Sequence, residues 1–131
     1  MPRGQLPENI QSFLGAPRPA VVGWVRRDGG AATAPVWFRF TDGTVELSMD
    51  AEGPRARALR EEPRFSLSIL GDSWYTQVTL HCRAQTFTAD TDHAVLDALS
   101  VHYTGEPYPD HAHPTLTVTA SVDRWHTFGE I

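Results

Sequence analysis

The chain has 131 residues, with eleven basic and sixteen acidic side chains and a formal net charge of -5 at pH 7. This length predicts one domain over residues 1–131, and the negative charge excludes an overall basic field for nucleic acid or an anionic membrane surface. All eleven bases are arginines, so a Schiff-base lysine, a phosphate loop ending in lysine and a Ser/Lys catalytic pair are excluded as well.

The single cysteine, Cys82, bears on the compartment in which the protein works. One cysteine cannot form an internal disulfide, and disulfide frameworks are typical of secreted domains. Residues 1–16 lack the apolar segment of a signal peptide, and no stretch approaches the roughly 18 apolar residues of a membrane span. We therefore expect a cytoplasmic protein that binds neither a membrane nor nucleic acid.

Short runs of patterned residues occupy the first part of the chain. Ile10, Phe13 and Leu14 at helical spacing predict a short helix over residues 7–15. After it, apolar and polar residues alternate, with turns of Asp and Gly between the runs, and this pattern predicts three antiparallel strands. These predicted strands span residues 20–26, 34–40 and 45–49.

The rest of the chain adds two helices and three strands. Pro54 opens and Pro63 closes a predicted short helix over residues 55–62. A second helix of about three turns is predicted at residues 90–103, ended by Gly105. The remaining predicted elements are strands at 65–69, 74–88 and 116–122 and a proline-rich loop at 106–114. Six strands with helices outside them indicate a mainly β fold, a small six-stranded antiparallel barrel.

Three arginines, Arg55, Arg57 and Arg60, lie at the start of the predicted helix 55–62. Guanidinium groups and the N–H groups of a helix N-terminus can together bind a phosphate. The same spacing also suits a solvated charged face balanced by neighbouring glutamates. Spacing alone leaves both interpretations open.

Side chains for acid, base or metal chemistry are poorly placed in this sequence. His81 and Cys82 are neighbours on a predicted strand and point to opposite faces, so they do not form a nucleophile pair, and we expect Cys82 in the core. His111 and His113 lie in the predicted loop without a third metal ligand at recognisable spacing. We therefore expect no metal site and no catalytic side chain supplied by the protein.

The large aromatic residues are numerous for so short a chain. They are Trp24, Trp37, Trp74, Tyr75 and Trp125. Trp37 shares a strand face with Thr33 and Pro35, opposite Val36. It either lies outside the barrel, where a planar ligand or a second subunit covers it, or packs beneath the helices.

Several runs, in this order, resemble the pyridoxamine-phosphate-oxidase-like split β-barrel family, over nearly the whole chain. The matching runs are AVVGWVRRDG (20–29), APVWF (34–38), PRARALR (54–60) and PRFSL (63–67). Two more runs resemble the branch of that family that uses the deazaflavin coenzyme F-420: SWY (73–75) and YTGEPYP (103–109). Each run is short, and only their order and spacing together make the resemblance specific.

The resemblance implies a split barrel of the FMN-binding type that forms a homodimer, with two cofactor sites in grooves between the subunits. It implies an oxidoreductase that transfers a hydride from reduced F-420 to a small unsaturated or conjugated acceptor. The cofactor ring carries the hydride in such chemistry, so no catalytic side chain is needed. The alternatives are an FMN-dependent oxidoreductase of the same fold and a protein that binds a flavin or haem without turnover.

The resemblance also assigns cofactor-binding roles by position. Arg55, which stands where the family often has lysine, and Arg57 would bind the cofactor phosphate. The residues expected to line the ring system are Thr33, Pro35, Val36 and Trp37. Met49 and Asp50 would lie beside the phosphate-bearing tail. Trp74, Tyr75 and Trp125 would reach the other subunit's site.

Overall fold

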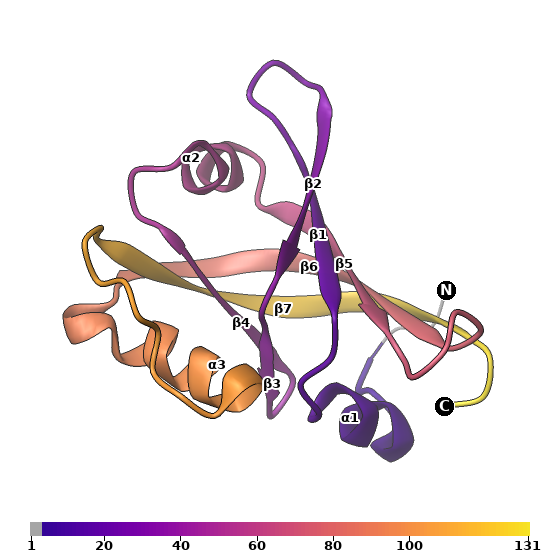
Figure 1. Cartoon of the computed structure of the whole chain (residues 1–131). Coiled ribbons are helices and arrows are strands. Elements are labelled where there is room, and N and C mark those ends of the chain that lie inside the picture. The colour runs from indigo at the N-terminus through magenta and orange to yellow at the C-terminus, as the bar shows by residue number, and fades with distance from the viewer. Residues whose placement is uncertain (1–3) are drawn as a thin grey trace.

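The computed structural model describes residues 4–131 (Figure 1). Within them no helix is both long enough and apolar enough to cross a membrane. The helices are α1 (Glu8–Leu14), α2 (Pro54–Glu61), the short 3-10 helix η1 (Thr91–His93) and α3 (Ala94–Thr104). The strands are β1 (Ala20–Val25), β2 (Ala31–Val36), β3 (Arg39–Thr41), β4 (Thr44–Asp50), β5 (Arg64–Leu70), β6 (Gln77–Ala89) and β7 (Thr115–Phe128).

The strands form one antiparallel sheet in the order β2-β1-β5-β6-β7-β4-β3. The prediction of a mainly β antiparallel fold with a few helices is confirmed. Two details of it are wrong: the sheet has seven strands rather than six, and it is open rather than a closed barrel among the described residues. In Figure 1 the β1–β2 hairpin rises above the sheet, while α2 lies above β4 and α3 below it.

The extra strand arises from the segment predicted as one strand over residues 34–40. Its first part belongs to β2 and pairs with β1, whereas its last part is β3 and pairs with β4. Only Trp37 and Phe38 separate β2 from β3, although these two strands are the opposite edges of the sheet. The chain itself therefore bridges the two edges at this point. Alternation of residue types does not reveal such a change of pairing partner.

The core confirms the alternation predicted for the longest strands. Val78, Leu80, Cys82 and Ala84 of β6 are all buried. Leu80 pairs with Leu67 of β5, which is also fully buried. Each such side chain contributes about 1.5–3 kcal/mol relative to its exposed state, so the predicted inward face of β6 is the centre of the fold.

The helix predicted at residues 90–103 begins later than expected. Asp92 and His93, the last two residues of η1, have left-handed backbone angles, with φ of 58° and 55°, and they produce a kink directly before α3. The Asp90 carboxylate accepts hydrogen bonds from the N–H groups of Val95 and Leu96, both at 3.0 Å. A carboxylate beside the first turn satisfies free N–H groups of the helix, and this contact stabilises the start of α3.

The ends of β6 and β7 also differ from the prediction. The strand predicted to start at residue 74 starts at Gln77, and β7 continues to Phe128 rather than ending near residue 122. These two strands pair along almost their whole length, with register shifts at His81/Cys82 and at Ala84/Thr86. Such bulges increase the local twist of a strand pair, which lets so long a pair of strands curve around the core.

Candidate functional site

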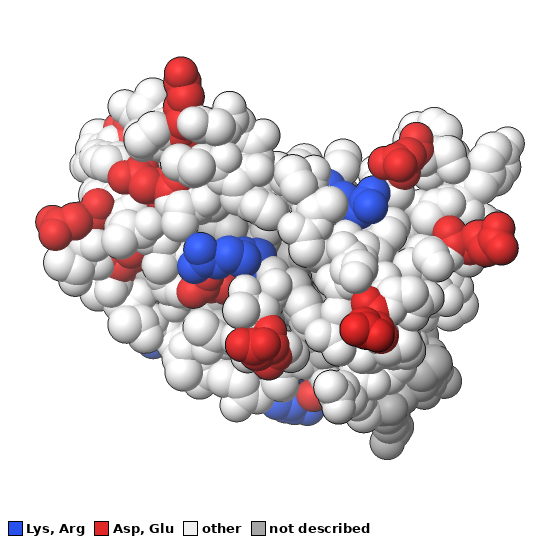
Figure 2. Space-filling model, turned by 90° about the horizontal axis from the view of Figure 1, so that it is seen from below, with Lys and Arg blue, Asp and Glu red and all other residues white. Residues whose placement is uncertain are grey.

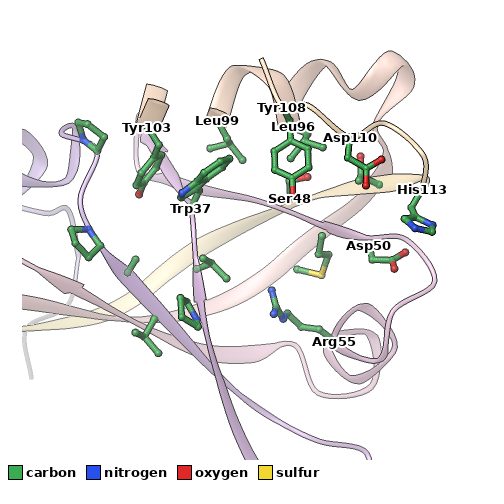
Figure 3. A pocket seen from close by; sticks show the side chains of 18 residues that line it. Trp37, Ser48, Asp50, Arg55, Leu96, Leu99, Tyr103, Tyr108, Asp110 and His113 are labelled. Carbon is green, nitrogen blue, oxygen red and sulfur yellow. The ribbon is translucent and has the colours of Figure 1, made fainter. Parts of the chain in front are cut away.

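A cavity of about 880 Å³ lies between α2 and α3 (Figure 3). Its size is in the range of about 300–1,000 Å³ usual for small-molecule sites. Six of the residues predicted to bind the cofactor line it: Pro35, Val36, Trp37, Met49, Asp50 and Arg55. The end of β2, the end of β4 and the first turn of α2 therefore meet at one cavity.

The aromatic part of the cavity is built around Trp37. The Tyr103 ring of α3 lies nearly parallel to the Trp37 indole, with 5.4 Å between centroids and 17° between planes. The Tyr108 ring meets Trp37 edge-on, with centroids 6.0 Å apart. Trp37 thus packs beneath α3, as one of its two interpretations expects, and it also lines the cavity.

Arg55 supplies the cationic part. It extends from the first turn of α2 towards the cavity, where Figure 3 places it across from Trp37 and Tyr108. Its guanidinium carbon lies 4.8 Å above the centroid of a Trp24 ring. Burial lowers the pKa of Arg55, and its Nε is a buried atom with no hydrogen-bond partner. Arg55 makes no ion pair with any residue in 4–131.

Few other polar groups face this cavity. Among the described residues that line it, Arg55 is the sole arginine, Asp50 and Asp110 are the acids, and the buried Ser48 hydroxyl has no partner. Figure 2, which shows the molecule from below, has scattered acidic groups and small, separate arginine groups on that face. The lining therefore suits a ligand that is planar and apolar at one end and carries one anionic group at the other.

Five predicted residues do not join this cavity. Thr33 lines a second cavity of about 780 Å³. Arg57 donates a hydrogen bond from Nη2 to the Glu52 carbonyl at 2.6 Å. Trp74 and Tyr75 are 83% and 76% exposed in the turn before β6, and Trp125 is 5% exposed within the core.

The three arginines of α2 do not converge on one anion site. Arg55 faces the cavity, Arg57 folds back on the preceding turn, and the Arg60 guanidinium carbon lies 4.6 Å above the Phe87 ring centroid. The expectation that Arg55 and Arg57 bind one phosphate together is therefore not met by their positions. Only Arg55 remains available to a ligand in the cavity.

One wall of the cavity was not predicted. Leu96, Leu99 and Tyr103 of α3 and Tyr108, Asp110 and His113 of the following loop complete it. The run of tyrosines and prolines over residues 103–109 marked this segment in the sequence. Nothing local in that run indicates that α3 packs against Trp37, which is distant in the chain.

The His81–Cys82 pair lies outside this cavity. Burial raises the pKa of the Cys82 thiol to about 12, and Cys82 is a core residue as expected. The His81 Nδ1 lies 3.2 Å from the Ser66 hydroxyl, and burial lowers the pKa of His81. Within residues 4–131, no group of three or more His, Cys, Asp or Glu side chains is placed to hold a metal ion.

Solved structures share this fold. An F-420 reductase superposes with a TM-score of 0.83 at 20% sequence identity, over 92% of this chain and 98% of that chain. A conserved hypothetical protein from Mycobacterium tuberculosis gives 0.75 at 22% identity, over 97% and 86% of the chains. General Stress Protein 26 from Bacillus anthracis str. Sterne gives 0.66 at 14% identity, over 92% of each chain. At these identities the likeness establishes the fold.

Comparison of sequences establishes the family. No curated protein matches the chain. The family model described as pyridoxamine 5'-phosphate oxidase, a name that denotes an oxidoreductase, matches residues 6–128. This range includes every element of the sheet and the whole lining of the cavity between α2 and α3. The chain therefore belongs to the pyridoxamine 5'-phosphate oxidase family.

Proposed function

We propose that this protein is an oxidoreductase that transfers a hydride from reduced coenzyme F-420, bound in the cavity between α2 and α3, to a small unsaturated or conjugated acceptor. The proposal rests on one observation: the half-buried Arg55 guanidinium lines the same cavity as Trp37 and has no ionic partner in residues 4–131. Burial of an unpaired charge is costly, and an anionic ligand group would offset that cost.

The residues of the cavity fit a cofactor of this kind. The unpaired Nε of Arg55 and the free N–H groups at the start of α2 suit a phosphate group. The buried, unpaired Ser48 hydroxyl provides a further hydrogen-bonding group in the lining. Trp37 and Pro35 provide a flat apolar surface for a ring system. The proposed cofactor would therefore extend from Trp37 towards α2.

The protein's part in the reaction follows from these positions. When bound, the coenzyme supplies the hydride, and the protein orients it and excludes water. Arg55 would hold the charged end, while Val36 and Leu99 keep the opposite end of the cavity apolar. The Tyr103 hydroxyl donates to the Arg18 carbonyl, so it is committed to the fold rather than to proton transfer.

We also propose that the protein acts as a homodimer. Trp74 and Tyr75 are large and exposed, and a symmetric interface would bury them. The Gly71 N–H donates to the Thr76 carbonyl at 2.8 Å and closes their turn. Gly129 packs against the turn so closely that an added Cβ would clash with the Tyr75 carbonyl oxygen. Two exposed aromatic side chains on a closed, packed turn favour a role in association.

The testing experiment is a titration of the purified, ligand-free protein with F-420 and, separately, with FMN, followed by ring fluorescence and calorimetry. We expect tighter binding of F-420 and steady-state oxidation of the reduced coenzyme by at least one member of a panel of conjugated acceptors. Preference for FMN would replace this proposal with an FMN-dependent oxidoreductase. Tight binding without turnover would indicate a protein that only holds its ligand, and binding of neither compound would remove the proposal.

A further inference from the structure

The segment after α3 forms one wall of the cavity. Residues 106–114 contain neither helix nor strand and include three prolines. Three of their side chains, those of Tyr108, Asp110 and His113, line the cavity. Gly105, with a left-handed φ of 86°, ends α3 and turns the chain into this segment. The position of these nine residues thus determines how far the cavity is closed.

Side chains of η1 and α3 hold this segment in place. Among the described residues, no backbone–backbone hydrogen bond joins residues 106–113 to the rest of the chain. The next residue, Pro114, accepts such a bond at its carbonyl from the Ala51 N–H, at 3.0 Å. A loop held only by side chains opens at a low free-energy cost once those contacts are removed.

Asp97 of α3 makes the central contact. Its Oδ1 accepts a hydrogen bond from the Tyr108 N–H at 3.0 Å and lies 2.9 Å from the His111 Nε2. The hydrogen bond with His111 lowers the pKa of Asp97, so this side chain is a carboxylate at neutral pH. One carboxylate oxygen therefore holds the segment at two positions, although Asp97 itself does not line the cavity.

Two further contacts lie on either side of Asp97. The His93 ring stacks on the His111 ring, with centroids 4.4 Å apart, and the His93 Nε2 donates to the His113 carbonyl at 2.8 Å. Nearer to Gly105, the Ser100 hydroxyl donates to the Glu106 carbonyl at 2.7 Å. Asp97 lies between these two attachments and holds the middle of the segment, where Tyr108 enters the cavity.

We propose that residues 106–114 form a lid over the cavity between α2 and α3 and that Asp97 is the positioning residue that keeps this lid closed. Loops that close over a bound ligand commonly control its release. Because the Tyr108 N–H donates to Asp97, loss of the carboxylate would free the Tyr108 ring from its edge-on contact with Trp37. This inference rests on the proposed function, since the lid controls access to the same site.

The first test measures amide hydrogen exchange of residues 106–114 in the ligand-free protein. Asp97→Ala removes both hydrogen bonds, and we expect exchange in this segment to become at least about tenfold faster. Asp97→Asn keeps an acceptor oxygen for the Tyr108 N–H, and it should restore most of the protection. Asp92→Asn is the matched control, because Asp92 is an acid of η1 that makes no hydrogen bond with a described residue and Asn tolerates its left-handed φ of 58°.

The second test measures the dissociation rate of F-420, the proposed cofactor, from the same variants by stopped-flow fluorescence. We expect about tenfold faster dissociation from Asp97→Ala and a rate close to that of the unaltered protein for Asp97→Asn and Asp92→Asn. If the amide exchange rates and the dissociation rate of Asp97→Ala match those of Asp92→Asn, the lid proposal is wrong. Failure of the unaltered protein to bind either FMN or F-420 would remove the proposed function alone, because the exchange experiment decides the lid without a ligand.

Discussion

The Tyr103 ring is stacked on the Trp37 indole, and its hydroxyl binds the backbone of two segments whose neighbouring residues line the cavity. That hydroxyl donates to the Arg18 carbonyl at 2.8 Å and accepts a hydrogen bond from the Phe38 N–H at 3.4 Å. Arg18 precedes β1, and Phe38 lies where the chain crosses from one edge of the sheet to the other. One side chain of α3 thus holds the aromatic end of the site in place.

Tyr103→Phe should lower the free energy of unfolding by about 1–3 kcal/mol, because two hydrogen bonds are lost and both backbone groups are part-buried. The stack on Trp37 is retained, so the fold should persist. Urea denaturation followed by circular dichroism measures the change. Tyr108→Phe is the control, since the Tyr108 hydroxyl makes no hydrogen bond with a described residue, and it should change stability by less than about 0.5 kcal/mol. Equal stability of the two variants would contradict the role of the Tyr103 hydroxyl.

Arg55→Ala should weaken F-420 binding by about 1.5–3 kcal/mol, tenfold or more in Kd, because a charge-assisted hydrogen bond to the phosphate is lost. The deazaflavin ring compound without the phosphate-bearing tail should bind the variant and the unaltered protein equally. Calorimetric titration with both ligands measures this difference. The melting temperature without ligand should change little, because Arg55 has no ionic partner among residues 4–131 to lose.

The matched control for Arg55 is Arg27→Ala. Arg27 is exposed and pairs with Glu61 at 3.0 Å, so this variant removes the same charge from a surface ion pair of small energetic value. Its affinity for F-420 should match that of the unaltered protein. An equal loss of affinity in both variants would point to a general effect of charge and would remove Arg55 as the phosphate ligand.

The double variant Trp74→Ala/Tyr75→Ala should be monomeric where the unaltered protein is dimeric, since both side chains are mostly exposed and removing them costs the folded chain little. Light scattering coupled to size-exclusion chromatography, over a range of protein concentrations, measures the mass. Val101→Ala, at an exposed apolar residue of α3, is the control and should stay dimeric. A double variant that remains dimeric would exclude this turn from the interface.

The free energy of unfolding should fall in alkaline solution because the Cys82 thiol is buried. Burial raises its pKa from 9.0 to about 12, so the folded protein keeps a proton that the unfolded chain releases. The contribution is fully present below pH 9 and is lost between about pH 9 and 12, with a slope near 1.4 kcal/mol per pH unit for one proton. Urea denaturation across this range, compared with Cys82→Ala, should show a shallower slope for the variant; identical slopes would contradict the buried thiol.

The local patterns of the sequence determined most of the elements. The helix at residues 7–15, the short helix after Pro54 and the inward face of β6 agree with the structure. These features depend on residues that are near neighbours: apolar spacing, proline at a helix start and alternation along a strand. Such patterns are properties of the chain itself and hold in whatever fold contains it.

The candidate site was predicted in part for a different reason. Pro35, Trp37, Met49 and Arg55 came from the resemblance to a family, and they do line one cavity. Arg57 did not join them, because its guanidinium binds the Glu52 carbonyl of the preceding turn. Sequence spacing places both arginines in the same helix turn, and only the packing around that turn decides which of them faces the cavity.

Tertiary structure alone decided the shape of the site. The split of residues 34–40 between β2 and β3 depends on which strands pair, and the stack of Tyr103 on Trp37 joins residues 66 positions apart. Asp97 likewise meets His111 across a turn and a loop. Contacts between distant residues arise when the whole sheet and its helices pack together, whereas local residue patterns are enough to define the elements and their buried faces.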